Sequence, residues 1–318
     1  MPDNIDQQNS EFNTSYANED EIDLRELMSV VWTGKWIILC LTLLFSGGSV
    51  VYAINQPNIY KSEALLAPVE QERAFGLGGL QSQLGGLASL AGVNLGGGSS
   101  SKTLLAIEIL KSRDFTTRFI QKHNILADLM APEGWNVADN SLTYQQDIYN
   151  FSENEWTRDV SLPLVSKPSM QEAYMAFSEI MSVNTDSDTG MITLAVEHIS
   201  PFIAHNWVNW LVDDINQTMK TRDVVEAKES TLFLTAQLEQ TKISDIREVL
   251  YNLIEEQTKT IMFANVREEY VFKTIDKALV PEAKSGPKRA LICILGTILG
   301  GVLGGVIVFF RYFNRGNI

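Results

Sequence analysis

The sequence predicts an α+β protein anchored by two membrane-spanning helices. Two uncharged hydrophobic runs lie near the ends of the 318-residue chain. Short alternating segments between them are typical of strands, and a long stretch without proline or glycine favours a helix. We expect strands at both membrane ends of the polar segment and helices in its middle, with one long helix projecting.

Composition excludes two classes of protein. A formal net charge of −14 argues against nucleic acid as a partner, because phosphate binding needs a basic face. The chain has two cysteines, Cys40 and Cys293, each near the start of a hydrophobic run. If the runs cross antiparallel, the thiols lie near opposite bilayer faces, beyond the ~6 Å Cα separation that a disulfide tolerates. The polar segment is therefore not held by disulfides.

The second hydrophobic run, Ala290 to Phe310, is long enough to cross a bilayer. Its 21 residues contain no charge and span roughly 30 Å as a helix. Small residues let helices approach closely in lipid, so we expect this span to pack through its glycines, with Ser46–Ser49 of the first run as a complementary surface. The expected packing residues are Gly296, Gly300, Gly301, Gly304 and Gly305.

The first run, Trp36 to Ile54, predicts the other span, with Trp32 and Trp36 at one interface and Tyr52 and Tyr60 toward the other. A cleaved signal peptide is the rival interpretation. The run is too long for one and follows an acidic rather than a short basic segment. We therefore expect an uncleaved span.

The N-terminal segment divides at Asp20. Residues 1–20 are polar and predicted to be disordered. The following residues carry apolar side chains at helical spacing and predict an amphipathic helix at the membrane surface. Two spans place both termini on one side, but basic residues flank the spans almost evenly, so the positive-inside rule leaves the side open. The apolar stripe comprises Ile22, Leu24, Leu27, Met28, Val31 and Trp32.

The polar segment opens with a predicted strand, Tyr60 to Pro68. A glycine- and leucine-rich tract follows from Phe75 to Gly98, and the sequence leaves open whether it packs as a small helix or docks on a neighbouring subunit. Thr103 to Leu129 predicts one helix, and Pro132 to Pro168 is expected to be irregular.

Further elements follow along the segment. Ser169 to Met181 has helical spacing. Ser182–Asp188 and Met191–Glu197 predict two strands around a turn-rich sequence. Glu268 to Pro281 predicts a strand that returns to the membrane.

The stretch from Pro201 to Asn265 predicts a rod of roughly 95 Å if it is one unbroken helix. From Leu232, apolar residues recur four and three apart, the pattern of a coiled-coil or oligomer seam. The alternative is two ordinary core helices with a break near Asp223 to Lys228, where the apolar stripe weakens. The expected seam residues are Leu232, Ala236, Ile243, Ile246, Leu250 and Leu253.

No catalytic, metal or cofactor motif stands out. The three histidines, His123, His198 and His205, lack metal-ligand spacing and are expected at the surface or in packing. Gly96 to Thr103 approaches a phosphate-binding loop, but Ser101 replaces its last glycine and no strand precedes it. We expect a linker that leads into a serine-capped helix, and no enzyme activity.

The layout resembles the bacterial chain-length determinant (Wzz) family of polysaccharide co-polymerases without a kinase domain. The most specific segments are Ile22–Leu27 through Trp36, and Pro281–Arg289 before the glycine-rich span. Tyr60–Pro68 also matches the family's first strand after the membrane. The Phe75–Gly98 tract departs from the pattern and resembles insertions in exopolysaccharide members, which leaves the polymer open.

The resemblance implies a bacterial inner-membrane protein with both termini cytoplasmic. It implies a cytoplasmic tail (1–35), a span (36–54), a periplasmic co-polymerase domain (55–289), a second span (290–310) and a cytoplasmic tail (311–318). It also implies a ring-like homo-oligomer on an α/β base. Members fused to a tyrosine kinase continue past the second span, so any such kinase is expected to be a separate protein here.

The implied function is non-enzymatic control of the modal length of O-antigen lipopolysaccharide or a related polymer made by a membrane polymerase. The expected partners are a second copy of the chain, that polymerase, the lipid-linked glycan and the bilayer. A periplasmic adaptor for capsule or exopolysaccharide export is the alternative, and a sensor's ligand-binding domain is a third candidate. The residues expected to couple base to anchor are Pro281, Pro287, Lys288 and Arg289.

Overall fold

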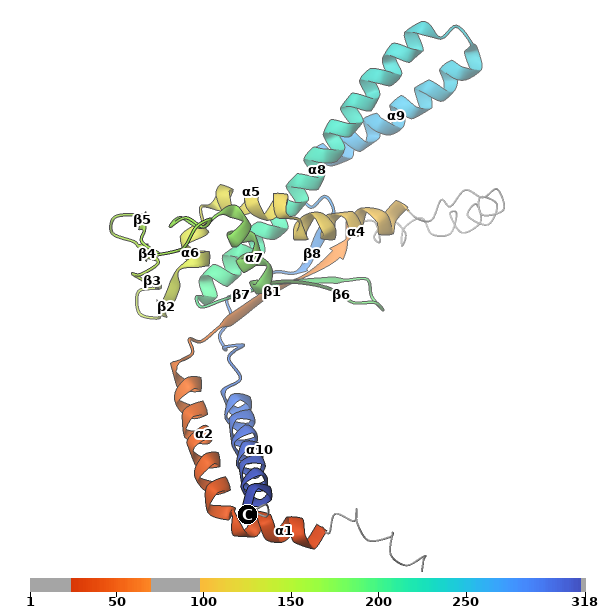
Figure 1. The fold of residues 1–318 in the computed structure, drawn as a ribbon. Helices are drawn as coiled ribbons and strands as arrows, with labels where there is room; N and C mark the ends of the chain where they lie inside the picture. The colour runs from red at the N-terminus through yellow and green to blue at the C-terminus, as the bar shows by residue number, and fades with distance from the viewer. Residues whose placement is uncertain (1–23, 70–97, 316–318) are drawn as a thin grey trace, which may run out of the picture. The chain divides into compact units, whose positions relative to one another are not determined.

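The computed structural model describes residues 24–69 and 98–315, and the fold is α+β as predicted. It forms two compact units (Figure 1). One contains the chain up to Gln56 together with the part from Pro287 onward, and the other is Pro57–Gly286. The expected disordered N-terminal tail and nearly all of the glycine- and leucine-rich tract lie outside the described residues.

Within the described residues, the first unit consists of three helices. α1 is the described part of the expected amphipathic helix, and it meets α2 at Gly34. α2 and α10 contain the two predicted spans and are long and apolar enough to cross a membrane. They pack against each other along their length. Their bounds are Leu24–Thr33 for α1, Lys35–Asn55 for α2 and Arg289–Arg315 for α10.

The second unit is built on a four-stranded antiparallel sheet in the order β6-β7-β1-β8. β1 has the predicted bounds, and its buried residues Ser62, Ala64 and Leu66 alternate as expected for a strand with one covered face. The predicted hairpin is β6 and β7, whose turn is held by the Asp186 carboxylate, which accepts the Asp188 and Thr189 amides. The strands are β1 (Tyr60–Pro68), β6 (Met181–Thr185), β7 (Ile192–His198) and β8 (Phe272–Asp276).

The prediction of a single helix from Thr103 to Leu129 is wrong, because the helix is interrupted twice in this stretch. Ser112 caps a new helix by accepting the Phe115 amide at 3.2 Å. Asn124 ends that helix in the left-handed conformation (φ 52°), which asparagine tolerates better than most residues. The resulting helices are α4 (Gly98–Lys111), α5 (Arg113–His123) and α6 (Leu126–Met130).

The predicted helix near Ser169 is α7 (Met170–Ile180), and Ser169 caps it reciprocally with Glu172. Part of the segment expected to be irregular instead forms two short hairpins, whose turns place Asn140 and Asn154 at φ 54°. These hairpins are β2 (Pro132–Asn136) with β3 (Ser141–Tyr144), and β4 (Tyr149–Asn150) with β5 (Glu155–Trp156).

The unbroken rod is also wrong. α8 (Pro201–Gln240) runs straight through the alternative break near Asp223–Lys228, ends at Gln240, and packs against α9 (Ser244–Val266) as a helical hairpin (Figure 1). Thr241 and Ile243 adopt extended backbone, to which β-branched residues are suited. α8 is still about 60 Å long.

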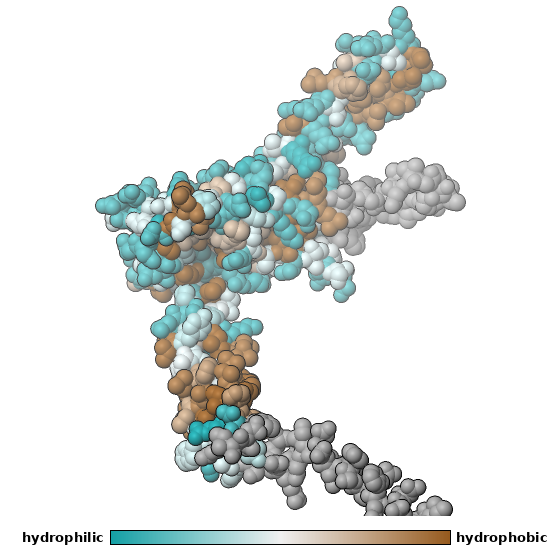
Figure 2. Space-filling model, in the orientation of Figure 1, coloured by the Kyte–Doolittle hydropathy of each residue, from teal (hydrophilic) through white to brown (hydrophobic). Residues whose placement is uncertain are grey.

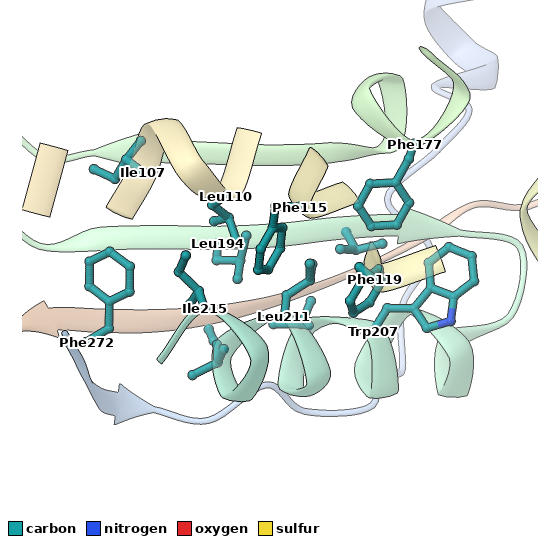
Figure 3. Close-up of a cluster of buried hydrophobic side chains, with 14 of the residues drawn as sticks. Ile107, Leu110, Phe115, Phe119, Phe177, Leu194, Trp207, Leu211, Ile215 and Phe272 are labelled. Atoms are coloured by element: carbon teal, nitrogen blue, oxygen red, sulfur yellow. The ribbon is translucent and has the colours of Figure 1, made fainter. Parts of the chain in front are cut away.

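One hydrophobic core holds the second unit together. Phe119 from α5, Phe177 from α7, Leu194 from β7 and Trp207 from α8 are fully buried in it (Figure 3). The N-terminal part of α8 therefore belongs to the core. Beyond Met219, Ala227 is the only residue of the described α8 that is buried, so the rest of this helix extends away from the core.

Candidate functional site: the span pair, its connection and the helical hairpin

Three of the five expected packing glycines face α2 at distances that allow no side chain. A Cβ built on Gly296 would lie 2.5 Å from the Ser49 Cβ, and one on Gly300 would lie 2.8 Å from the Phe45 Cβ. On Gly304 it would lie 2.8 Å from the Ile38 Cα. These glycines occur every four residues, so they share one helix face.

The other two glycines are placed differently. A Cβ on Gly301 would be in ordinary contact, 3.8 Å from the Thr42 Oγ1, and one on Gly305 would meet nothing within 4 Å. Gly47 and Gly48 of the expected complementary surface Ser46–Ser49 also face open space, whereas Ser49 contacts Gly296. The α2 face is formed mainly by Ile38, Thr42 and Phe45.

Gly34 lies in close contact with Val308 of α10, and the sequence analysis missed this contact. A Cβ on this residue would overlap both methyl carbons of Val308 on α10. Gly34 also separates α1 from α2, with φ −91° and ψ 7°. The glycine between two helical patterns is a sequence signal for a break between helices. It does not reveal the contact with Val308, because that residue is distant in the sequence.

The chain enters and leaves the second unit at neighbouring positions. Ile59 and Gly286 form an isolated antiparallel bridge, and the Ile59 carbonyl also accepts the Ser285 amide at 2.8 Å. Next to the bridge, the Ser62 hydroxyl donates to the Leu279 carbonyl at 2.8 Å. These bonds tie the first strand to the returning segment.

The expected coupling residues lie in the segment that leads from the second unit into α10. Pro281 and Pro287 are partly buried, and Pro287 opens the approach to α10. The Lys288 carbonyl accepts the amides of Leu291 and Ile292 in the first helical turn. The Arg289 guanidinium donates to the Gln56 carbonyl at 3.1 Å, which links the start of α10 to the end of α2.

The expected seam residues are divided between the two helices and the link of the helical hairpin. Leu232 and Ala236 lie on α8, whereas Ile246, Leu250 and Leu253 lie on α9, with Ile243 just before it. A continuous heptad seam is therefore wrong. Leu232 is 73% exposed and Ile243 is 60% exposed, so much of the apolar surface faces outward (Figure 2). Further exposed apolar side chains of the hairpin are Phe233, Val249, Met262, Phe263 and Val266.

The Arg247 side chain holds the tip of the hairpin. Its guanidinium donates to the carbonyls of Leu238 (3.1 Å) and Thr241 (3.3 Å), which are acceptors at the C-terminal end of α8. Sequence reasoning missed this contact because it joins two helices across a turn.

The histidines have structural partners. His198 is buried, its Nε2 lies 3.0 Å from the Asp128 carbonyl and its Nδ1 accepts the Ser200 amide; burial lowers the pKa of its ring. His123 stacks on Trp210 and lies 3.0 Å from the Asp214 carboxylate. Within residues 24–69 and 98–315, no group of three metal-ligating side chains could hold a metal ion.

A cavity of about 1380 Å³ lies along α8 and β8, and both basic and acidic side chains line it. Lys122 pairs with Asp214, and Lys220 donates to the Arg267 carbonyl. Burial, followed by the charge of Asp214, raises the pKa of the neighbouring Asp213 carboxyl.

Lys102, from the sequence that approaches a phosphate-binding loop, forms an ion pair with Asp223 at 2.8 Å.

The two apolar helices fit a membrane-anchored protein whose extramembrane unit combines an α+β base with a helical hairpin. The Wzz family, described as "Chain length determinant protein", matches residues 20–123. The family described as "G-rich domain on putative tyrosine kinase" (GNVR) matches residues 240–313. Together these matches cover more than half of the chain, and each includes one span. These two matches support a Wzz-type chain-length determinant protein.

One similar solved structure is a "full-length bacterial polysaccharide co-polymerase". It is 13% identical, with a TM-score of 0.37, and the alignment covers 93% of this chain and 99% of that chain. No curated protein matches the sequence.

Proposed function

We propose that this protein is a non-enzymatic, oligomeric inner-membrane regulator of polysaccharide length. It sets the modal chain length of O-antigen lipopolysaccharide, or of a related surface polysaccharide made by a membrane polymerase. The observation that carries this proposal is the Wzz match over residues 20–123, which extends from α1 through the first span and β1 to the end of α5.

In this proposal the second unit lies in the periplasm and both termini lie in the cytoplasm. Two spans require both termini on one side, and the family resemblance supplies the side. The Ile59–Gly286 bridge brings the two ends of the extramembrane unit together. A neighbouring pair of connections suits a unit that is held at the membrane by two adjacent helices.

Length control by a protein of this kind acts through assembly rather than through bond chemistry. The α2–α10 contact gives each protomer a fixed two-helix anchor, and the apolar surface of the hairpin offers a face to a second copy or to the polymerase. In this scheme, an assembly of defined size holds the polymerase and the growing glycan together until the polymer reaches its modal length.

A periplasmic adaptor in capsule or exopolysaccharide export is the second candidate, and the helical hairpin of α8 and α9 favours it. The 23 residues of α9 give the hairpin a length of about 35 Å, and this projection would reach toward an outer-membrane channel. Co-purification of such a channel with the intact protein would support the adaptor.

Deletion and restoration of the gene test the proposal. The surface polysaccharide is analysed on a gel from the wild-type host, the deletion strain and the complemented strain. We expect the length distribution to lose its mode on deletion and to regain it on restoration. Polymer of normal length that accumulates inside the deletion strain would contradict length control and support export.

A further inference from the structure

A smaller cavity of about 490 Å³ lies beside the β4–β5 hairpin. This volume is within the range of small-ligand sites, roughly 300–1,000 Å³. Three segments line it: the junction of α5 and α6 at Asn124, the hairpin from Asn154 to Trp156, and the loop residues Ser166 and Lys167. All three belong to the second unit.

The lining combines aromatic rings with unpaired polar groups. Tyr149 and Trp156 contact each other with ring centroids 4.8 Å apart. Within the part of the chain that the structure describes, the side chains of Glu155 and Lys167 form no hydrogen bond or ion pair, and the Trp156 indole N–H has no acceptor. The cavity therefore offers a ring face, a strong acceptor and two donors. Among the described residues that line the larger cavity beside α8, none is Tyr, Trp or Phe.

The walls of the cavity are fixed by bonds that do not use these groups. Arg158 forms a two-pronged ion pair with Glu172 (2.7 and 3.0 Å) and also donates to the carbonyls of Ser166 (2.7 Å) and Val165 (2.9 Å). This arrangement holds the loop that carries Lys167. The Tyr149 hydroxyl donates to the Asn154 Oδ1 at 2.6 Å, which orients that amide in its turn.

An aromatic ladder supports the cavity from the side. Phe151 stacks on Tyr144 (5.1 Å, 7°), and Tyr144 contacts Tyr149, which contacts Trp156. Phe151, at the outer end, is 63% exposed. The rings pack against one another, so binding need not order them, which lowers the entropic cost of association.

Sugars have the complementary chemistry. A pyranose presents C–H groups on its faces, which pack on aromatic rings, and hydroxyl groups at its edge, which need both donors and acceptors. We propose that this cavity binds a saccharide unit of a surface polysaccharide, with the sugar face against Trp156 and its hydroxyl groups on Glu155 and Lys167. The inference names a direct glycan contact for the proposed length regulator, and only the identity of the polymer rests on that proposed function.

Calorimetric titration of the full-length protein in lipid nanodiscs tests the site. The probe is a set of short oligosaccharides released by mild acid from the host's own surface polysaccharide. We expect saturable binding by the wild type and a Kd raised about tenfold in the Glu155→Gln/Lys167→Ala double variant, because bonds to charged groups are lost. Trp156→Phe, which keeps a ring but removes the N–H, should weaken binding a few-fold. Phe202→Ala removes a surface aromatic outside the cavity and should bind like the wild type.

The outcomes separate this inference from the proposed function. No saturable heat with the wild type, or unchanged affinity in the double variant with an unchanged melting temperature, overturns the saccharide site. Length control then stands or falls on the gel of the deletion and complemented strains alone. Binding that is lost in the double variant supports the site even if deletion leaves the polymer length unchanged.

Discussion

The side chain of Asn216, on α8, forms two hydrogen bonds with the backbone of Phe272, the first residue of β8. Its Nδ2 donates to the Phe272 carbonyl and its Oδ1 accepts the Phe272 amide, both at 3.0 Å. The same oxygen accepts the amides of Tyr270 (3.0 Å) and Val271 (2.8 Å). Asn216 is 4% exposed, so one buried amide fixes the chain where it returns from the helical hairpin to the sheet.

Replacement of Asn216 by leucine should destabilise the extramembrane unit by about 3 kcal/mol, because buried backbone groups lose this side-chain partner. Thermal unfolding of the full-length protein in detergent measures this change. Gln217→Leu is the matched control, because Gln217 is exposed and bonds only to Thr221. Equal melting temperatures of the two variants would contradict the role of Asn216.

The contact between the two spans depends on Gly300 and Gly304, and substitution of these residues tests it. The Gly300→Leu/Gly304→Leu variant should separate α10 from α2, because even a Cβ would lie 2.8 Å from atoms of Phe45 and Ile38. Gly305→Leu should be tolerated, because its position faces open space.

Spin labels on the two native cysteines, Cys40 and Cys293, report the separation of the helices, with labelled protein diluted in a cysteine-free variant. We expect a broader distance distribution in the double glycine variant and an unchanged one in the Gly305→Leu control. We also expect the double variant to shift the polymer length distribution. Normal polymer length at a normal protein level would refute the link between span packing and function.

Elements with a local signal could be predicted from the sequence. The spans, β1 and the β6–β7 hairpin depend on hydrophobic period and turn residues, which neighbouring residues display. The start of α8 was visible at Pro201, but its end was not. Gln240 is followed by neither glycine nor proline, and the carbonyls there are bound by Arg247, a contact that appears only after the chain has turned.

The candidate site also contains some contacts that a local sequence pattern predicts and others that it does not. Gly296, Gly300 and Gly304 are among the glycines through which the sequence predicts span packing, and the structure places all three against α2. Gly301 and Gly305 form a second pair with the same spacing, but the position of Gly305 faces open space. The contacts of Gly34 with Val308 and of Asn216 with Phe272 join residues distant in sequence, so no local pattern could reveal them.

Arg247→Ala should loosen the tip of the helical hairpin. The guanidinium satisfies the Leu238 and Thr241 carbonyls, and its loss should cost about 1–2 kcal/mol locally, in the range for a bond to a charged group. Hydrogen exchange of the tip amides measures the effect. We expect exchange in residues 238–247 to become roughly tenfold faster, while the β1 amides remain unchanged. Lys242→Ala is the control, and equal exchange at the tip in both variants would show that Arg247 does not hold it.

The Arg158–Glu172 pair predicts a loss of stability in acid. The hydrogen bond from Arg158, followed by the Ser169 amide, lowers the pKa of the Glu172 carboxyl to about 2. A carboxyl with a lowered pKa stabilises the fold above its unfolded pKa of about 4.5, and this contribution disappears as the pH falls toward 2. The wild type should therefore lose about 1 kcal/mol more than Glu172→Gln between pH 6 and pH 3, after allowance for solvent screening. Denaturant unfolding at both pH values measures the difference, and parallel pH profiles would exclude this source of acid sensitivity.

The exposed apolar surface of the hairpin makes the last prediction. If the proposed oligomer buries this surface, the Leu232→Glu/Ile246→Glu variant should dissociate, because a charge buried without a partner costs several kcal/mol per ion. The fold of each protomer should remain, because both side chains are exposed, at 73% and 45%. Particle mass in detergent, measured over a range of protein concentrations, gives the oligomeric state. Asn252→Glu adds a charge to an exposed polar position on α9 and should keep the wild-type mass. A double variant with the same mass as this control would place the subunit contacts elsewhere, because a hairpin that can carry two new charges without dissociation is not buried between protomers.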